Sequence, residues 1–291
     1  MNAKLRSLTR ACSLVARPLA VVLCVSLITA CKPQKAGSDT LARIQQEKVL
    51  RVAYINYPPS AFRDPATGQM TGHFVDALRE LTQTLNPQIK LEFIETNWAD
   101  FASILNSGRA DLSICGTFTT IPRAKLVTFT RPIVYLGRGA VVRRDDTRWR
   151  PDAPVSQFDR PDIKVGVVNG EGSYELAKAT FKNTKNIVVF DGADLSQCLA
   201  AVSAGQVDVG LSDSLETGKY TSVHTEVVDV YKDNPQDVMP IAWSVRHDDH
   251  TWKNFLDTAL TALESQGKMS RWEATYGFKW TKPALDLKPR S

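Results

Sequence analysis

The chain has 291 residues and a formal net charge of +5, with 43% hydrophobic and 23% charged residues. That length and apolar content suffice for one two-lobed protein or two ordinary domains. Four basic residues and no acidic ones fall within the first 30 positions, so the rest of the chain is close to neutral and nucleic-acid binding is not expected.

The first 30 residues have the pattern of an export signal. Basic residues precede an apolar stretch from Leu19 to Ala30, which is too short to span a bilayer. Residues 1–30 are therefore predicted to be a signal peptide of the lipoprotein type. The sequence Leu27-Ile-Thr-Ala-Cys31 resembles a bacterial lipobox, so we expect Cys31 to be lipidated and to anchor the chain to the membrane. Ordinary cleavage after Ala30, which would release a soluble periplasmic protein, is the alternative.

Residues 31–40 are mainly polar and include Pro, Gly and Ser, so they are predicted to form a flexible tether. Strand and helix patterns alternate beyond it, which is typical of an α/β fold. Strands are predicted at 49–55, 89–94, 112–114, 163–168, 188–190, 207–211 and 241–245. Helical spacing of apolar residues is found at 74–85, 98–105, 174–181, 195–202 and 252–263.

Two stretches of the chain share one local pattern. Asn106-Ser-Gly-Arg-Ala-Asp-Leu-Ser-Ile114 is followed 97 positions later by Ser203-Ala-Gly-Gln-Val-Asp-Val-Gly-Leu211. Each pattern indicates a helix end, a Gly just after the helix cap, a polar step with Asp, and a short apolar strand. We therefore expect two similar α/β lobes that bind ligands beyond the carboxyl ends of their strands.

Chemically useful side chains follow both of these strands. The first strand leads into the polar loop 115–123, which ends at Arg123, and the second leads to Asp213. One lobe thus presents a cation and the other an anion. The Cys and His residues show no metal-ligand spacing, so neither a metal nor a cofactor is expected. Cys115 and Cys198 are predicted to be small buried hydrophobic residues.

These motifs resemble those of the family 3 extracellular solute-binding proteins, the amino-acid receptors of ABC importers. The resemblance covers nearly the whole chain beyond the tether. It implies a periplasmic-binding-protein fold of two α/β lobes, in which each lobe is a mixed sheet flanked by helices and two crossover strands join the lobes. The matching segments, in family order, are 51–60, 72–76, 98–105, 107–111, 120–123, 170–175, Asp213 and 267–272.

The resemblance also implies a division of the chain. Lobe 1 would comprise residues 41–138 and 246–291, and lobe 2 would comprise residues 139–245 with both crossover strands, near 139–142 and 241–245. A hinge motion would close the lobes around the ligand. The protein is expected to be a periplasmic monomer that delivers an amino acid or small carboxylate to an ABC permease in the membrane.

The family's ligand contacts transfer residue by residue. Arg123 would hold a ligand carboxylate through bidentate, charge-assisted hydrogen bonds, the alternative being an ordinary surface arginine. The amides of Gly172 and Ser173, at a helix start, would contact the same anion. Asp213 would pair with the ligand ammonium, because a buried carboxylate is costly without a partner. The other predicted contacts are Tyr57, Trp98, Gly116, Phe118 and Thr120.

Structural roles remain open for several of these residues. Gly172 can belong to a plain turn, and Asp213 can be the N-cap of the helix after it. Thr120 is as well suited to an N-cap as to ligand contact. Aromatic side chains also fill hydrophobic cores, which is the alternative for Tyr57 and Trp98.

Two positions depart from the family pattern. Tyr54 stands where receptors for basic amino acids carry an Asp, which argues against arginine, lysine or histidine as the ligand. Phe118 stands five residues before Arg123, where a Ser or Thr hydroxyl usually helps to bind the ammonium. Losing that hydrogen bond would cost about 1–3 kcal/mol. Either Asp213 compensates, or the ligand is not a standard α-amino acid.

The main alternative function is enzymatic. Cyclohexadienyl dehydratases share this fold, and Glu175 lies where their catalytic glutamate would be. A Glu at that place also supports a helix N-terminus in ordinary binding proteins, and a lipid anchor suits a receptor beside a permease. We therefore expect a binding protein and no enzyme. A stand-alone ligand-sensing module is a further alternative.

Overall fold

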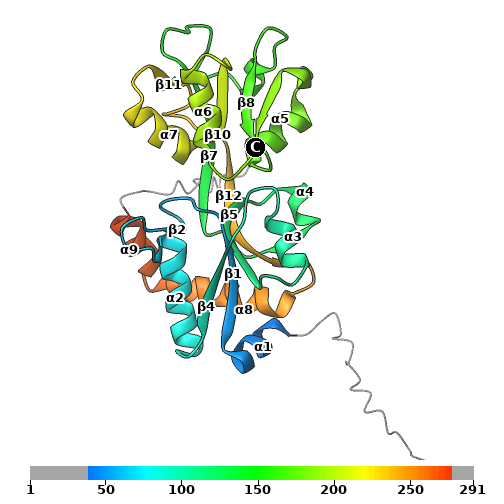
Figure 1. The fold of residues 1–291 in the computed structure, drawn as a ribbon, viewed down its shortest axis with the longest axis vertical. Helices are drawn as coiled ribbons and strands as arrows, with labels where there is room; N and C mark the ends of the chain where they lie inside the picture. Colours follow the sequence, from blue (N-terminus) through cyan, green and yellow to red (C-terminus); the bar gives the residue numbers. More distant parts are fainter. Residues whose placement is uncertain (1–38, 277–291) are drawn as a thin grey trace, which may run out of the picture. The chain divides into compact units, whose positions relative to one another are not determined.

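The computed structural model describes residues 39–276 (Figure 1). The predicted signal peptide, the lipidation site Cys31 and the tether up to residue 38 lie outside the described residues, as do residues 277–291 of predicted lobe 1. None of the helices between residues 39 and 276 has both the length and the apolar character needed to cross a membrane.

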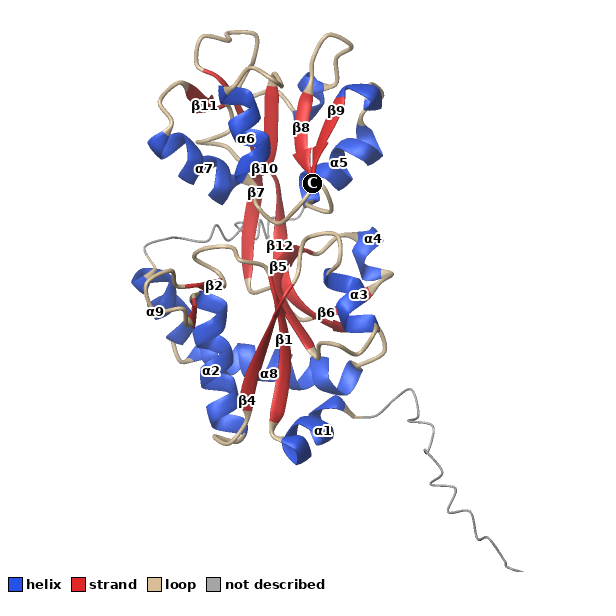
Figure 2. Ribbon diagram, in the orientation of Figure 1, coloured by secondary structure: helices blue, strands red, loops and turns tan. Residues whose placement is uncertain are grey.

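Twelve strands are found in the described part of the chain, and ten of them form one sheet (Figure 2). The strands of this sheet are β1 (Val49–Tyr54), β4 (Lys90–Glu95), β5 (Leu112–Phe118), β6 (Val127–Phe129), β7 (Val134–Arg143), β8 (Val165–Val168), β9 (Ile187–Phe190), β10 (Val209–Asp213), β11 (Val227–Asp229) and β12 (Gln236–Arg246). The small hairpin of β2 (Phe62–Arg63) and β3 (Met70–Thr71) stands apart from it.

The main path of the sheet runs β4–β1–β5–β12–β7–β10–β8–β9. The strands β4, β1 and β5 are parallel to one another and form the first parallel group. The second parallel group consists of β10, β8 and β9. Between the groups lie β12 and β7, which pair antiparallel with each other and with the neighbouring group. The predicted α/β class with a mixed sheet is confirmed.

The strands that join the two groups are longer than the sequence pattern indicated. Both β7 and β12 begin several residues earlier than predicted because they pair with each other, for example at Val134 with Ile241 and at Leu136 with Met239. The end of β5 was also predicted wrongly, since the strand continues beyond residue 114 into the expected polar loop. It does so because Thr117 and Phe118 pair with β12.

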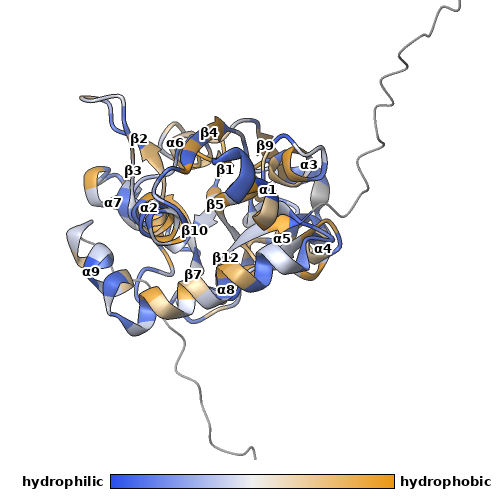
Figure 3. Cartoon of the chain, turned by 90° about the horizontal axis from the view of Figure 1, so that it is seen from below, coloured by the Kyte–Doolittle hydropathy of each residue, from blue (hydrophilic) through white to orange (hydrophobic). Residues whose placement is uncertain are grey.

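Nine α-helices flank the strands in the described part of the chain. Their bounds are α1 (Thr40–Glu47), α2 (His73–Leu85), α3 (Phe101–Asn106), α4 (Ile121–Ala124), α5 (Gly172–Thr180), α6 (Ser196–Ser203), α7 (Ser214–Val223), α8 (His250–Ser265) and α9 (Lys268–Thr275), with short 3-10 helices at Val155–Phe158 and Thr184–Asn186. Apolar and polar residues are interleaved along α8 (Figure 3). The helix buries Trp252, Leu256, Leu260 and Leu263, as its spacing predicted.

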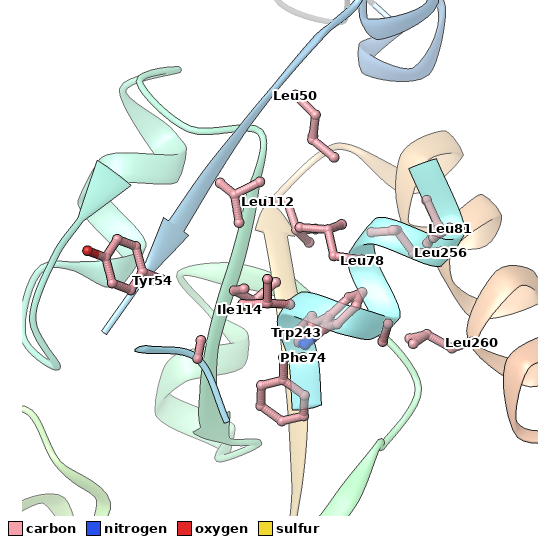
Figure 4. Packing of buried hydrophobic residues seen from close by; sticks show 14 of the residues in the cluster. Leu50, Tyr54, Phe74, Leu78, Leu81, Leu112, Ile114, Trp243, Leu256 and Leu260 are labelled. Atoms are coloured by element: carbon pink, nitrogen blue, oxygen red, sulfur yellow. The ribbon is translucent and has the colours of Figure 1, made fainter. Parts of the chain in front are cut away.

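Buried apolar side chains form three clusters. One cluster packs α2 and α8 against the first parallel group, with Phe74 edge-on to Trp243 at 5.9 Å between ring centroids (Figure 4). Another packs around the second parallel group. The third combines residues of both groups, among them Trp98 and Leu199. Burying one such side chain contributes about 1.5–3 kcal/mol, so this third cluster helps to hold the groups together.

The repeated sequence pattern forms the same junction twice. Helix α3 ends before Gly108, which has φ +71°, and α6 ends before Gly205, which has φ +70°. In each case the Gly is followed by an Asp and then by a strand, β5 or β10, of one parallel group. The predicted duplication is confirmed. Cys115 and Cys198 are both buried and unbridged, as predicted.

Candidate ligand-binding site

One small cavity gathers most of the residues predicted to contact a ligand. Its volume is about 10 Å³, which is room for one water-sized group. Residues of β7, β12 and the start of α5 complete its wall. The predicted residues that line it are Tyr57, Trp98, Gly116, Phe118, Arg123, Gly172 and Asp213, and the others are Leu136, Glu171 and Ile241.

The two remaining predicted residues lie beside the cavity wall. Thr120 is the N-cap of α4, where its hydroxyl accepts the Arg123 amide at 3.3 Å. Ser173 lies in the first turn of α5, and its hydroxyl accepts a hydrogen bond from Arg138 at 3.1 Å. Both side chains therefore have structural roles next to residues that face the cavity.

Arg123 is almost fully buried, with 2% of its surface exposed. Each nitrogen of its guanidinium donates to an acceptor within the chain. Nε meets the Glu175 carboxylate at 2.8 Å, Nη2 meets the carbonyl of Gly170 at 2.6 Å, and Nη1 meets the carbonyl of Phe118 at 3.2 Å. The Glu175 carboxylate also accepts from the Thr120 hydroxyl at 3.3 Å. The predicted carboxylate-binding residue is thus paired with a carboxylate of the protein itself.

The N-terminus of α5 is likewise occupied by a side chain of the protein. The Glu171 carboxylate caps this helix and accepts the Ser173 amide at 2.6 Å. Gly172 lies against the ring of Phe118, where a Cβ would come within 2.5 Å of Cδ2. This contact requires glycine, and it brings the helix start and the end of β5 together across the cavity.

Asp213 ends β10 and faces the cavity while it also caps α7. Its Oδ1 accepts the amides of Leu215 and Glu216, each at 2.9 Å, and the Tyr57 hydroxyl donates to the carboxylate at 2.8 Å. Asp213 is therefore both the N-cap of α7 and a residue of the cavity wall. Burial and the negative charge of Glu171 raise the pKa of Asp213 to about 7.

The aromatic residues form one side of the cavity. Tyr57 and Trp98 pack edge to face at 5.8 Å between ring centroids. The indole of Trp98 donates to the carbonyl of Ala193 at 2.9 Å. These contacts place Tyr57, Trp98 and Phe118 in the wall and in the surrounding apolar packing at once.

Close backbone packing joins the two sides of the site. Gly170 has φ +74°, and a Cβ on it would lie 2.4 Å from the Ala99 backbone nitrogen. Gly170 precedes α5, whereas Ala99 precedes α3. Loops that follow the two parallel groups therefore touch at this point.

Two charged residues of the site were not identified from the sequence. Glu171 lines the cavity and is 2% exposed, yet it lies in a Gly-containing loop that gives no pattern of its own. Arg138 is also 2% exposed, and its guanidinium lies 5.4 Å from the centre of the Phe118 ring. Its position in β7 depends on strand register, which local sequence does not reveal.

A second and larger cavity adjoins the first at Tyr57, which lines both. We call it the outer cavity, and its volume is about 450 Å³. Its charged residues are Glu95, Asp194, Glu216 and Lys219.

Comparison with known proteins shows that the chain is similar both to bacterial transport receptors and to enzymes. The model of the bacterial extracellular solute-binding proteins, family 3, matches residues 50–279. Cyclohexadienyl dehydratase of Pseudomonas aeruginosa is 24% identical over 260 residues, which covers 88% of this chain and 93% of that protein. A probable amino-acid ABC transporter-binding protein of Haemophilus influenzae is 28% identical over 207 residues, with 69% and 70% covered.

A solved structure shows the same arrangement of the chain. It is that of an ancestral amino acid-binding protein described as a precursor of cyclohexadienyl dehydratase. Its TM-score is 0.70 at 25% sequence identity, and the match covers 82% of this chain and all of the ancestral protein.

Proposed function

We propose that this chain, which belongs to the bacterial extracellular solute-binding proteins of family 3, binds an amino acid or small carboxylate and delivers it to an ABC importer. One observation carries the proposal. Seven residues predicted as ligand contacts come from separate segments of the chain and line a single cavity. Convergence of charged and aromatic side chains on one concave site is typical of ligand binding.

Binding would proceed by closure of two lobes, which we assign to residues 41–138 with 246–291 and to residues 139–245. The bonds from Arg123 to Glu175 and from Tyr57 to Asp213 connect these lobes. A ligand that contacts both lobes would favour the closed arrangement. The hinge would lie in β7 and β12, the strands that join the parallel groups.

We further propose a periplasmic monomer anchored by a lipid on Cys31 beside its permease. The family match and the transport relative support the location outside the cytoplasm. Metabolic labelling with a fatty acid should mark the wild type and not Cys31→Ser. An unmodified mature N-terminus would contradict the anchor.

Closure of the two lobes can be tested with any ligand, whatever its charge. A thermal-shift screen of amino acids and small carboxylates would first identify a ligand. Gly170→Ala should then weaken its binding about tenfold or more, because the added Cβ overlaps the Ala99 backbone when the lobes close. Gly68→Ala is the matched control, since Gly68 has φ +69° but no atom within 4 Å of a Cβ. Equal effects of both changes on affinity would contradict binding by closure.

An enzyme of the dehydratase type is the second candidate, favoured by the 24% identical relative. Catalysis by Glu175 would require its carboxyl group to be available, and this group is bonded to Arg123 and Thr120. Purified protein incubated with prephenate or arogenate is therefore expected to form neither phenylpyruvate nor phenylalanine. Measurable turnover would contradict the proposal of a binding protein.

A further inference from the structure

We propose that Asp237 and Arg138 form the pivot of lobe closure, and that their ion pair couples bending at the pivot to both sides of the candidate cavity. This inference rests on the proposed function, because it names the conformational control of the same site. Asp237 lies in β12 and Arg138 lies in β7, the two strands that pass between the parallel groups (Figure 2). Both residues lie outside the cavity wall, so they would act on binding through the residues they contact.

Arg138 is the residue at which β7 meets both groups of strands. On one edge of β7, the pairing with β12 runs from Val134 opposite Ile241 to Arg138 opposite Gln236. On the other edge, the pairing with β10 starts with Asp213, which is again opposite Arg138. The sheet therefore passes from one group to the other through the ladder partners of this residue. We expect a rotation between the lobes to be centred there.

A β-bulge interrupts β12 beside this point. Between the pairs formed by Arg138 and by Leu136, β12 has one residue more than β7. The extra residue of a bulge is left unpaired, and the bulged strand bends. Gly137 lies opposite the bulge, where a Cβ on it would come within 2.4 Å of Cβ of Pro235. The two strands thus combine irregular pairing with close packing at the place where the lobes join.

Asp237 lies within the bulge and has a left-handed backbone, with φ +46°. In the described part of the chain, Lys48 at the end of α1 is the only other residue besides glycines in this region. The conformation costs free energy for a residue with a Cβ, and such outliers are concentrated at functional sites and switch regions. The bulge would therefore change shape if residue 237 could not adopt this conformation.

The side chain of Asp237 holds Arg138 at the pivot. Its carboxylate lies 3.5 Å from Nε of Arg138, whose guanidinium is almost fully buried. Burial lowers the pKa of Arg138, and the negative charges of Glu171 and Asp237 oppose that effect. A buried cation is costly without such partners. Of these two acids, Asp237 is the one that belongs to the bulge, so its carboxylate links the bend of β12 to the position of Arg138.

Arg138 contacts one residue from each assigned lobe. Its Nη1 donates to the Ser173 hydroxyl at 3.1 Å, at the start of α5. Its guanidinium also lies 5.4 Å from the centre of the Phe118 ring, at the end of β5. The Phe118 ring packs against Gly172, and both of these residues line the cavity. A shift of Arg138 would therefore displace both sides of the cavity wall.

Substitutions at Asp237 separate the backbone conformation from the charge. Asp237→Val should disfavour the left-handed conformation, because Val is β-branched. Asp237→Asn and Asp237→Gly leave that conformation accessible and remove the charge. Lys48→Val is the control for strain at another left-handed residue. Asp233→Asn is the control for the loss of an exposed negative charge just before β12.

Small-angle X-ray scattering measures the arrangement of the lobes without added compounds. Asp237→Val should have a larger radius of gyration than the wild type, because the two sides of the cavity would no longer meet. Affinity is then measured by calorimetry with the amino acid or small carboxylate that raises the wild-type melting midpoint most. Asp237→Val should bind it about tenfold more weakly, and Asp237→Asn and Asp237→Gly about threefold more weakly. Both controls should match the wild type in scattering and affinity.

The outcomes distinguish this inference from the proposed function. If folded Asp237→Val scatters and binds as the wild type does, the inference is overturned and the proposed function stands. Equal effects of Asp237→Val and Lys48→Val would also overturn it, because strain far from the pivot would then be sufficient. If Asp237→Val does not fold, wild-type affinity of Asp237→Asn overturns the inference. If scattering changes as expected but no compound shifts the wild-type midpoint, the pivot stands and the proposed function is contradicted.

Discussion

The two helix-to-strand junctions of the repeat have the same backbone geometry but different surroundings. In the first, the Asp111 amide donates to the carbonyl of Arg51 at 2.8 Å, and its carboxylate accepts the Arg51 amide at 3.0 Å. In the second, Asp208 and Lys164 make the same two bonds, each at 2.9 Å. The Asp of this motif therefore ties the junction to the start of the neighbouring strand.

The ion pairs around the two aspartates differ. The Asp111 side chain is 6% exposed and pairs with Arg43 at 2.6 Å and with Arg51 at 2.9 Å. The Asp208 side chain is 23% exposed, and its arginine partners Arg148 and Arg143 lie at 3.2 and 3.8 Å. The shared local pattern thus gives both junctions the same backbone geometry. The burial of the Asp side chain sets how strongly its ion pairs stabilise each junction.

The largest expected effect is on the free energy of unfolding of Asp111→Ala. Removing the Asp111 carboxylate should cost about 1.5–3 kcal/mol, because its charged hydrogen bonds with Arg51 and its ion pair with Arg43 are lost. Asp208→Ala should cost about 1 kcal/mol, as its ion pairs are longer and more exposed. Urea unfolding of both variants measures the difference. Equal losses would mean that the shared backbone bonds, and not the surroundings, carry the energy.

A second difference between the copies is that only β10 ends in a buried acid, Asp213. Burial, followed by the charge of Glu171, raises its pKa from 3.8 to about 7. The folded state then binds the proton more tightly than the unfolded state, so this group makes the protein less stable as pH rises between those two values. Asp213→Asn should remove that part of the slope when melting midpoints are measured across this range. Identical slopes in the variant and the wild type would contradict the raised pKa.

The smallest expected effects on the free energy of unfolding come from replacing the glycine of each junction, and they should be equal in the two junctions. Gly108 and Gly205 have φ of +71° and +70°, and a Cβ on either would have no atom within 4 Å. Replacing each by Ala should cost about 1 kcal/mol, the cost of a left-handed conformation for a residue with a Cβ. Thermal or urea unfolding would measure both. A clear inequality would show that the two turns are not equivalent.

Local sequence patterns predicted much of the fold. The apolar spacing of α8 and the duplicated junctions were both found where they were expected. Such features depend on residues three or four positions apart, or on a Gly in a left-handed turn, and both are visible in a short window. Residues at or beyond strand ends, among them Arg123 and Asp213, also line the candidate cavity.

Only the tertiary structure decided how the charges of the site are paired. The sequence by itself determined that Arg123 lies beyond the end of one strand, that Asp213 lies at the end of another, and that α5 begins near Gly172. It did not determine that Glu175 bonds to Arg123 from 52 positions away, or that Tyr57 reaches Asp213 from 156 positions away. Both pairs depend on how β7 and β12 pair with each other, because the register of these two strands determines which loops of the two parallel groups lie next to each other. Electrostatic energy depends on distances and burial in the folded chain, and neither can be read from local sequence.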